Sequence, residues 1–475
     1  MKLTSKIRFI LTITLLSTTK FVISAKERPN IILIMTDDQG WFDAGFNGNK
    51  MIQTPNLDAL AQQGVIFDRF YSASSVCSPT RASVMTGRNP NRMGIPSANT
   101  GHLKLEEITI AELLRKEGYA TGHFGKWHLG TLTKKVKDAN RGGKEKHFEH
   151  FTIPSMHGYD EFFCTESKVP TYDPMIYPTT FKEGESKKYG WTAVAKGERS
   201  EAYNTFYWVD NEQKASNDLS GDDTKLIVDQ VIPFIHQSVS NKKPFFTTVW
   251  PHTPHLPVVT SEYYKNKYAH LSNKEQLYYG CITALDEQVG RLWQELKELG
   301  LAENTMIWFC SDNGPENGTP GSAGKFRARK RSLYEGGLRT PAFVVWKKEL
   351  AGNQRLDFPA YTSDYMPTIL NILNIEYPDN RPVDGMDIMP LIQHSSMQRE
   401  KPMGFQFNNR ISWVTHQYKL ISEDAGKTFE LYDLINDEKE QNNIIQNNSE
   451  LAQHMKEDLL EWKKSVSHSL NGNDY

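Results

Sequence analysis

Three short apolar runs, each ending in polar residues, place the strongest limit on how this chain can fold. Residues 29–36 form a continuous run rich in β-branched residues that stops at Asp37 and Asp38, and residues 243–250 and 305–310 follow the same pattern. Runs of this length without strict alternation are typical of strands that are buried on both faces. In open parallel sheets the carboxyl ends of such strands meet at one edge, where ligands bind. We therefore expect the polar residues after all three runs to lie close together.

Helical patterns fill the intervals between these runs. They lie at residues 56–64, 109–118, 224–238 and 274–300, and the last two have apolar residues spaced three and four apart. Strands that alternate with helices predict an α/β domain with a large, mostly parallel mixed sheet sandwiched by helices. The segment 131–221 is long, irregular and rich in tyrosine, tryptophan and lysine. An irregular segment of this length in a compact domain is usually functional.

The pattern changes near residue 399. Short alternating runs at residues 411–415, 418–421 and 430–434 are followed by a helical pattern over residues 450–470. This order predicts a smaller antiparallel sheet with a covering helix. We therefore expect a leader at residues 1–25, a large α/β domain at residues 26–398 and a small C-terminal α+β subdomain at residues 399–475.

The first 25 residues have the pattern of a secretory signal peptide. Lys2, Lys6 and Arg8 precede an apolar run over residues 9–16, and small residues end at Ala25. The apolar run is too short to span a hydrocarbon core of about 30 Å, so a cleaved signal is favoured over a membrane anchor. We expect an exported protein without a stable membrane anchor. The composition, rich in asparagine, lysine and isoleucine, favours a bacterial periplasm first and extracellular release second.

Charge and cysteine content exclude two further classes of function. The chain has 55 lysine and arginine residues against 57 aspartate and glutamate residues, a net charge of −2. Nucleic-acid binding needs a basic surface that displaces counterions, and this balance gives none. The four cysteines are too few and too scattered for a disulfide framework, and none forms a Cys-x-x-Cys pair typical of zinc or redox sites. They are Cys77, Cys164, Cys281 and Cys310. The sequence leaves the oligomeric state open.

Residues 75–88 combine a reactive side chain with the signals of a helix start. Pro79 as the first helical residue, Ser78 as the cap and Gly87 as the stop predict a short helix with Cys77 just before it. The N-terminus of a helix presents unpaired N–H groups and a positive dipole to an anion. Taken alone, a cysteine at such a position is more often a small buried hydrophobic residue.

The spacing of Cys77, Pro79 and Arg81, followed by Thr86-Gly87-Arg88, changes that interpretation. It resembles the signature of the type I sulfatases, the formylglycine-dependent enzymes of the alkaline phosphatase superfamily. A second signature of that family, Gly-Lys-Trp-His-Leu-Gly, stands at residues 125–130 at the expected separation. The resemblance runs from about Pro29 to about Asn443, with further matches at residues 37–40, 158–163, 252–255, 311–314, 334–337 and 430–434.

The resemblance implies a covalent mechanism for the hydrolysis of sulfate monoesters. A maturation enzyme would oxidise Cys77 to formylglycine (3-oxoalanine), and one hydroxyl of its hydrate would attack sulfur and release the alcohol. His128 would then take the proton of the second hydroxyl, so that sulfate leaves by elimination. His252, with Lys330, would protonate the leaving oxygen. The implied catalytic residues are Cys77, Arg81, Lys126, His128, His252 and Lys330.

Cationic side chains and a metal ion would neutralise the sulfate oxygens. Asp37 and Asp38, with Asp312 and Asn313, bring hard oxygen ligands to the ends of two strands, as Ca²⁺ or Mg²⁺ requires. An isolated Asp-Asp pair is more often a turn with helix caps. The resemblance implies one Ca²⁺ at these four positions, in contact with the modified Cys77, with Mg²⁺ less favoured.

The substrate-binding residues are less clearly marked in the sequence. Lys330 is chosen for its distance before residues 334–337, and Arg329 or Arg327 is the alternative cation and a candidate substrate ligand. His255 either contacts the sugar or packs in the core. The expected substrate is a sulfated polysaccharide or oligosaccharide, such as an algal glycan or a host glycosaminoglycan, with aromatic residues of the segment 131–221 stacking on sugar rings.

Two alternatives remain open. A phosphate ester hydrolase of the same superfamily usually carries an Asp-His pair for a second metal where this chain has Asp312 and Asn313. A catalytically silent protein that binds sulfated glycans would have lost at least one catalytic residue, yet all the expected ones are present.

Overall fold

The computed structural model describes residues 27–475 with the exception of residues 180–190, 196, 211–212, 217 and 395. The predicted leader at residues 1–25 lies outside the described residues, and export and its destination remain predictions. In the described part of the chain, no helix combines the length and the apolar character that crossing a membrane requires.

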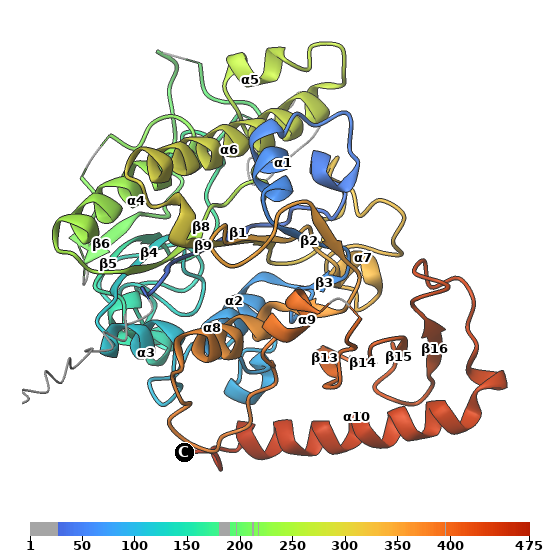
Figure 1. The fold of residues 1–475 in the computed structure, drawn as a ribbon. Coiled ribbons are helices and arrows are strands. Elements are labelled where there is room, and N and C mark those ends of the chain that lie inside the picture. The colour runs from blue at the N-terminus through green and yellow to red at the C-terminus, as the bar shows by residue number, and fades with distance from the viewer. Residues whose placement is uncertain (1–26, 180–190, 196, 211–212, 217, 395) are drawn as a thin grey trace, which may run out of the picture.

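A ten-stranded mixed sheet organises most of the described chain (Figure 1). Its strands are β1 (Asn30–Thr36), β2 (Val65–Phe67), β4 (Ala120–Lys126), β5 (Glu161–Thr165), β6 (Trp208–Asp210), β7 (Gln213–Lys214), β8 (Phe245–Trp250), β9 (Thr305–Ser311), β10 (Phe343–Val345) and β11 (Gln354–Leu356). They lie in the order β11-β2-β10-β9-β1-β8-β4-β5-β6-β7. The five neighbours from β9 to β5 are all parallel, so their carboxyl ends meet at one edge.

The alternation of side chains along β1 explains why helices cover both faces of the sheet. Ile31, Leu33 and Met35 pack into one apolar cluster, whereas Ile32 and Ile34 pack into another on the opposite face. The first face is covered by α2 (Cys77–Thr86), α3 (Ile110–Lys116) and α8 (Tyr365–Leu373), and the second by α1 (Pro55–Gln62), α4 (Asp223–Ser240) and α6 (Asn273–Glu298) (Figure 1). The predicted α/β class is therefore confirmed.

Two of the five parallel strands, β4 and β5, escape the sequence patterns. β4 contains Gly122, His123, Gly125 and Lys126, residue types that seldom mark a buried strand, yet it pairs in parallel with β8 on one side and β5 on the other. β5 lies within the segment 131–221, which the sequence presents as irregular. Tertiary pairing, rather than local propensity, places both strands in the sheet.

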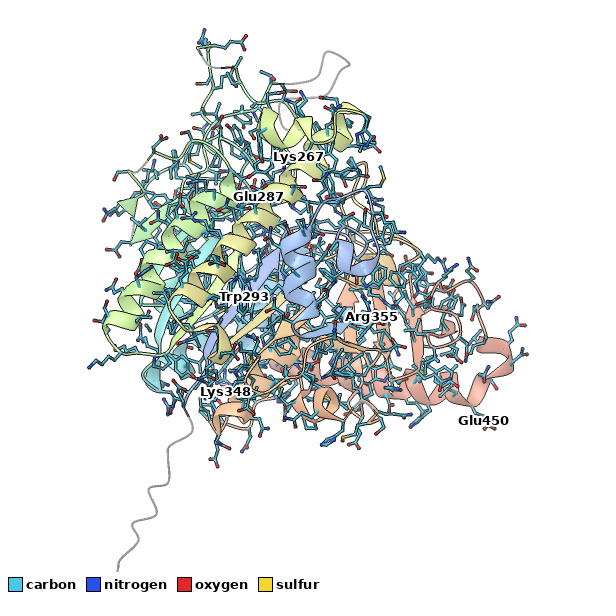
Figure 2. The ribbon with its side chains drawn as sticks, turned by 45° about the horizontal axis from the view of Figure 1, so that its top comes forward. Lys267, Glu287, Trp293, Lys348, Arg355 and Glu450 are labelled. Atoms are coloured by element: carbon cyan, nitrogen blue, oxygen red, sulfur yellow. The ribbon has the colours of Figure 1, made fainter. Side chains whose placement is uncertain are left out.

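A second, four-stranded antiparallel sheet follows near the C-terminus, as expected. It consists of β13 (Met403–Phe407), β14 (Arg410–Val414), β15 (Tyr418–Ser422) and β16 (Glu430–Asp433), and α10 (Ser449–Leu470) packs against it. β13 is an addition to the three predicted runs. In Figure 2, Glu450 marks the first turn of α10, well away from Glu287 and Trp293 on α6.

Buried ion pairs join this second sheet to a short helix of the α/β domain. The ammonium group of Lys419, in β15, lies 3.0 Å from Glu335 Oε1 and 2.8 Å from Glu440 Oε1. Glu335 begins the short helix α7 (Glu335–Leu338), and its other oxygen accepts hydrogen bonds from Tyr71 and Arg339. The second sheet thus fixes the start of α7, and with it the chain segment that follows Lys330.

Replacing Lys419 with methionine removes the cation that compensates two buried carboxylates. We expect the free energy of unfolding to fall by about 3–5 kcal/mol, because breaking a buried pair leaves uncompensated charge. The exposed Lys427→Met is the matched control and should stay within about 0.5 kcal/mol of the parent protein. Equilibrium urea unfolding measures both, and equal stabilities for the two variants would contradict this role of Lys419.

Candidate active site

The predicted polar residues meet at the carboxyl edge of the parallel strands. Asp37 and Asp38 follow β1, Lys126 is the last residue of β4, and Asp312 and Asn313 follow β9. The backbone N–H of Asp312 donates to the carbonyl of Thr36, 3.0 Å away, which holds the ends of β1 and β9 together. The backbone N–H of Asp37 also donates to the carbonyl of Thr253, after β8, at 3.1 Å, so the residues that follow all three predicted runs lie close together, as expected.

Each carboxylate of this group faces a cation. Lys126 Nζ donates to Asp37 Oδ2 at 2.6 Å, and Arg81 Nη2 donates to Asp312 Oδ2 at 2.7 Å. The ammonium group of Lys330 donates to Asp38 Oδ1. All of these side chains are at least 95% buried, so solvent screens their charges very little.

The carboxyl pKa values reflect the competition between burial and charge. Burial raises the pKa of Asp37, but Lys126, His255 and Arg81 together hold it well below its usual range. Burial and the neighbouring Asp37 raise the pKa of Asp312 to about 7, although Arg81 opposes them. The two carboxyl groups are thus pushed in opposite directions, and a further positive charge among them would favour the ionised form of both.

Within this cluster, three buried oxygen atoms have no hydrogen-bond partner among the described residues: Asp37 Oδ1, Asp38 Oδ2 and Asn313 Oδ1. The amide of Asn313 donates to Asp38 Oδ1 at 2.7 Å, which orients its own oxygen. Buried oxygens rarely remain unpaired, and carboxylate and amide oxygens are the ligands that hard divalent cations prefer. The residues therefore fit a Ca²⁺ or Mg²⁺ ion.

Further donors surround the same point. Ligand atoms of Asp37, Asp38, Cys77 and His255 all lie within 4.8 Å of one another. Both oxygens of Asp312 are already engaged, one by Arg81 and the other by the backbone N–H of Asp38 at 3.1 Å. Asp312, one of the expected metal ligands, therefore also fixes the position of Arg81.

Cys77 begins α2 instead of preceding it. The helix starts at Cys77 with Val76 as its cap, so Ser78 is not the capping residue and Pro79 is the third helical residue. The predicted stop is correct, because Gly87 adopts a left-handed φ of 68° that favours glycine. Burial raises the pKa of the Cys77 thiol to about 12, and its sulfur lies 3.6 Å from Lys330 Nζ. The thiol is therefore protonated at neutral pH and a poor nucleophile as it stands.

His128 faces the same cavity with one free nitrogen. Its Nε2 lies 3.0 Å from Asn99 Oδ1, which can only accept, so Nε2 carries the proton. Its buried Nδ1 has no hydrogen-bond partner among the described residues. Burial, together with Lys126 and Arg81, holds the pKa of His128 well below its usual value, so the ring is neutral. Sequence reasoning missed Asn99, which no motif marks.

The structure corrects the expectation for His252. Its ring is fully buried, with Nδ1 3.0 Å from Asp223 Oδ2 and Nε2 2.7 Å from the hydroxyl of Thr165. Both nitrogens are therefore occupied by the protein, and His252 does not line the cavity. His255, left open between two roles, is the imidazole that does, with Nε2 3.6 Å from Asp38 Oδ2.

Lys330 and the adjacent Arg329 occupy different positions in the structure. Lys330 lies within the cluster, next to Asp38 and Cys77. Arg329 points elsewhere: its guanidinium donates to backbone carbonyls of the loop, including that of Glu316 at 3.0 Å and that of Thr319 at 3.2 Å. Arg329 is therefore held outside the cluster and is not among the residues that line the cavity, and its contact with substrate stays a prediction.

A cavity of about 860 Å³ opens above this cluster. The segment 131–221 contributes polar and aromatic groups to its wall, and β13 of the second sheet contributes Phe407. Its lining includes Cys77, Asn99, Lys126, His128, Asn140, Ser167, Lys168, Trp191, His255, Lys274, Asn317, Lys330, Arg331 and Phe407. A pocket of this size accommodates several sugar rings or a molecule of similar bulk.

The fold and the site together define a hydrolase of anionic esters with a buried oxygen-ligand cluster at the edge of a parallel sheet. The family model described as Sulfatase matches residues 29–375, and that described as N-sulphoglucosamine sulphohydrolase, C-terminal, matches residues 323–465. The chain therefore belongs to the sulfatase family, as its motifs predicted, and is a hydrolase of sulfate esters.

Individual relatives agree with this assignment. N-acetylgalactosamine-6-sulfatase of Mus musculus is 30% identical over 83% of this chain and 72% of its own length. Steryl-sulfatase of Homo sapiens is 29% identical over 85% of this chain and 76% of its own length. Among solved structures, Ps i-CgsB in complex with k-i-k-neocarrahexaose has a TM-score of 0.77 and 26% identity, covering 93% of this chain and 94% of that chain.

Replacing His252 should destabilise the protein more than replacing His255, the other histidine of the turn after β8. His252→Ala leaves the buried carboxylate of Asp223 without its ring partner, so we expect the free energy of unfolding to fall by about 2–4 kcal/mol. His255→Ala removes a cavity-lining ring and should cost less than about 1 kcal/mol. Denaturant unfolding measures the stability of both variants, and an unchanged stability of His252→Ala would contradict the structural role that its contacts with Asp223 and Thr165 indicate.

Proposed function

We propose that this sulfatase hydrolyses sulfate monoesters of an oligosaccharide, with a formylglycine nucleophile made from Cys77 and one Ca²⁺ ion. The observation that carries the proposal is the position of Cys77. Its Sγ marks where the nucleophilic oxygen stands after oxidation, at the start of α2 and 3.6 Å from Lys330 Nζ. The carboxylate cluster lies on its other side, within 4.8 Å. The hydrated aldehyde supplies a hydroxyl nucleophile that the protonated thiol does not.

The charge of the site suits an anionic ester. Three carboxylates, those of Asp37, Asp38 and Asp312, are matched by three cations, those of Arg81, Lys126 and Lys330. A divalent ion among the three unpaired oxygens leaves the site with a positive excess, and this excess stabilises the charge on the sulfate oxygens in the transition state. The bound ion supplies that electrostatic stabilisation and no proton transfer.

His128 acts as the base for the group at position 77. Its Nε2–H is held by Asn99, so the unpartnered Nδ1 is the atom that accepts a proton in the cavity. Because its ring is neutral at physiological pH, that lone pair is available. Taking the proton of the second hydroxyl releases sulfate and restores the aldehyde.

Lys330 and His255 occupy the wall where the leaving oxygen departs, in place of the expected His252. Burial opposes the charge on Lys330, but Asp38 raises its pKa above the usual range, so the ammonium persists and donates to the developing alkoxide. His255 is held by a 2.6 Å hydrogen bond from Nδ1 to the carbonyl of Leu256, and its Nε2 faces the cavity side of Asp38.

The relatives and the cavity support a sulfated sugar as the substrate. One relative is named for N-acetylgalactosamine 6-sulfate and one solved neighbour holds a neocarrahexaose. The cavity wall carries Trp191, Phe407 and Asn140, a mixture of aromatic faces and amides that suits sugar rings and hydroxyls. No observation favours a phosphate ester or a silent binding role over this substrate.

Cys77→Ala should abolish turnover while the protein stays folded. Protein made together with a formylglycine-forming enzyme would be assayed for sulfate release from sulfated neocarrahexaose and from oligosaccharides of N-acetylgalactosamine 6-sulfate. We expect a loss of roughly 10⁴-fold or more in kcat for the alanine variant, as for other removed nucleophiles. Mass spectrometry of the peptide that contains residue 77 should show an aldehyde in the parent protein.

Three results would contradict this proposal. They are full activity of Cys77→Ala, faster release of phosphate from phosphate monoesters than of sulfate, and binding of the sugars without any turnover by aldehyde-bearing protein.

Removing the unpaired amide oxygen of Asn313 should weaken metal binding. Ca²⁺ that binds only the folded protein raises the unfolding temperature with concentration. We expect this rise in the parent protein and in Asn317→Ala, whose side chain lies at the cavity but outside the cluster, and a smaller rise in Asn313→Ala. Calorimetry with Ca²⁺ and with Mg²⁺ measures it, and an equal rise in all three proteins would place the ion elsewhere.

A further inference from the structure

Imidazole rings gather at a second place, on the outer side of the loop that carries Asn99. His102 Nδ1 lies 3.1 Å from His150 Nδ1, with ring centroids 5.3 Å apart and planes tilted by 54°. His150 ends the short 3-10 helix η3 (Glu145–His150), and His147 on the same turn lies 5.8 Å from it, centroid to centroid. The sequence analysis assigned no role to these residues.

The Nδ1–Nδ1 contact requires a proton on one ring and a lone pair on the other. His150 Nε2 lies 3.5 Å from the exposed carboxylate oxygen Oε1 of Glu149, an electrostatic contact that favours the proton of His150 on Nε2 and the lone pair on Nδ1. A carboxylate behind the second nitrogen of a histidine is the arrangement that orients imidazole ligands of metals. His102 Nδ1 then donates the shared hydrogen, and it presents a lone pair when its proton moves to Nε2.

We propose that His102 and His150 bind a transition-metal ion of the zinc class through their Nδ1 atoms, at a site separate from the oxygen-rich active site. Two nitrogens bound to a tetrahedral Zn²⁺ ion stand about 3.3 Å apart, given Zn–N bonds of about 2.05 Å. The observed 3.1 Å matches this spacing without rearrangement of the backbone. The inference does not depend on the proposed substrate.

The surroundings define which ion is accepted. Burial and nearby cations, Arg141 among them, lower the pKa values of His102 and His150, so both rings are neutral at pH 7. Neutral imidazole nitrogens suit Zn²⁺, Ni²⁺ and Cu²⁺, whereas Ca²⁺ and Mg²⁺ prefer oxygen ligands. The buried Nδ1 of His147 also has no hydrogen-bond partner in the described part of the chain, and its ring lies 5.8 Å from that of His150, centroid to centroid. Water completes the coordination, since the side chain of His150 is 21% exposed.

A metal here connects two segments that support His128. Arg141 donates to the carbonyl of Gly101 at 2.6 Å, and Asn140 donates to Asn99, the partner of His128. On the other side, the backbone N–H of Thr131 donates to the carbonyl of His150. The ion would therefore join η3 to the loop that positions the base.

The test is a titration of the full-length protein with Zn²⁺ in excess Ca²⁺, which keeps the oxygen site filled. Calorimetry should show one Zn²⁺ site in the parent protein, weakened by about tenfold or more in His102→Ala and in His150→Ala. His454→Ala is the matched control, because that imidazole is exposed and lies 4.0 Å from Asp458 on α10. Titration with Co²⁺ should give visible absorption that is absent from His102→Ala and His150→Ala and retained in the control.

Folding of each variant is checked by its unfolding temperature in Ca²⁺, and His150→Gln, which keeps the size of the side chain, replaces any alanine variant that does not fold. Zn²⁺ affinity unchanged in His102→Ala and His150→Ala would overturn the proposal, as would a parent protein that binds no Zn²⁺ once Ca²⁺ is present. Loss of sulfatase activity in Cys77→Ala leaves this Zn²⁺ titration unchanged, so the two proposals fail independently.

Discussion

Carboxylates buried at the edge of a parallel sheet impose the constraint on which the site depends. Asp37, Asp38 and Asp312 are each at most 1% exposed, and burial alone favours their neutral forms. They persist beside one another because Arg81, Lys126 and Lys330 arrive from three other parts of the chain and face them. The same cations surround Cys77, so the interaction that stabilises the carboxylates also prepares a site for an anionic ester.

Supporting residues beyond the cavity hold these groups in position. His252, fixed between Asp223 and Thr165, anchors the turn that presents His255. Asn99 fixes the tautomer of His128, and the ion pairs of Lys419 hold the segment after Lys330 from the second sheet. The small sheet thus helps to position Lys330 next to Cys77. It also contributes Phe407 to the cavity wall.

Much of the fold was predictable because its strongest signals are local. The runs that become β1, β8 and β9 are apolar throughout and end in polar residues, and the long amphipathic patterns become α4, α6 and α10. β4 and β5 were not predictable in this way, since glycine, histidine and lysine in β4 obscure its pattern and only pairing with β8 defines it. Of the site, motif spacing pointed to Asp37, Asp38, Cys77, His128 and Lys330, and the aromatic content of the segment 131–221 pointed to residues such as Trp191, whereas Asn99 carries no local signal.

The sequence by itself determined the family, the α/β class and the chemical groups available at the sheet edge, because motif spacing and apolar periodicity are properties of neighbouring residues. Only the tertiary structure decided which of two nearby histidines faces the cavity and which of two adjacent cations, Arg329 or Lys330, joins the cluster. It also brought His102 and His150 together across 48 residues. Side-chain direction and long-range proximity depend on how the backbone turns and what packs around it, and local sequence patterns do not reveal either.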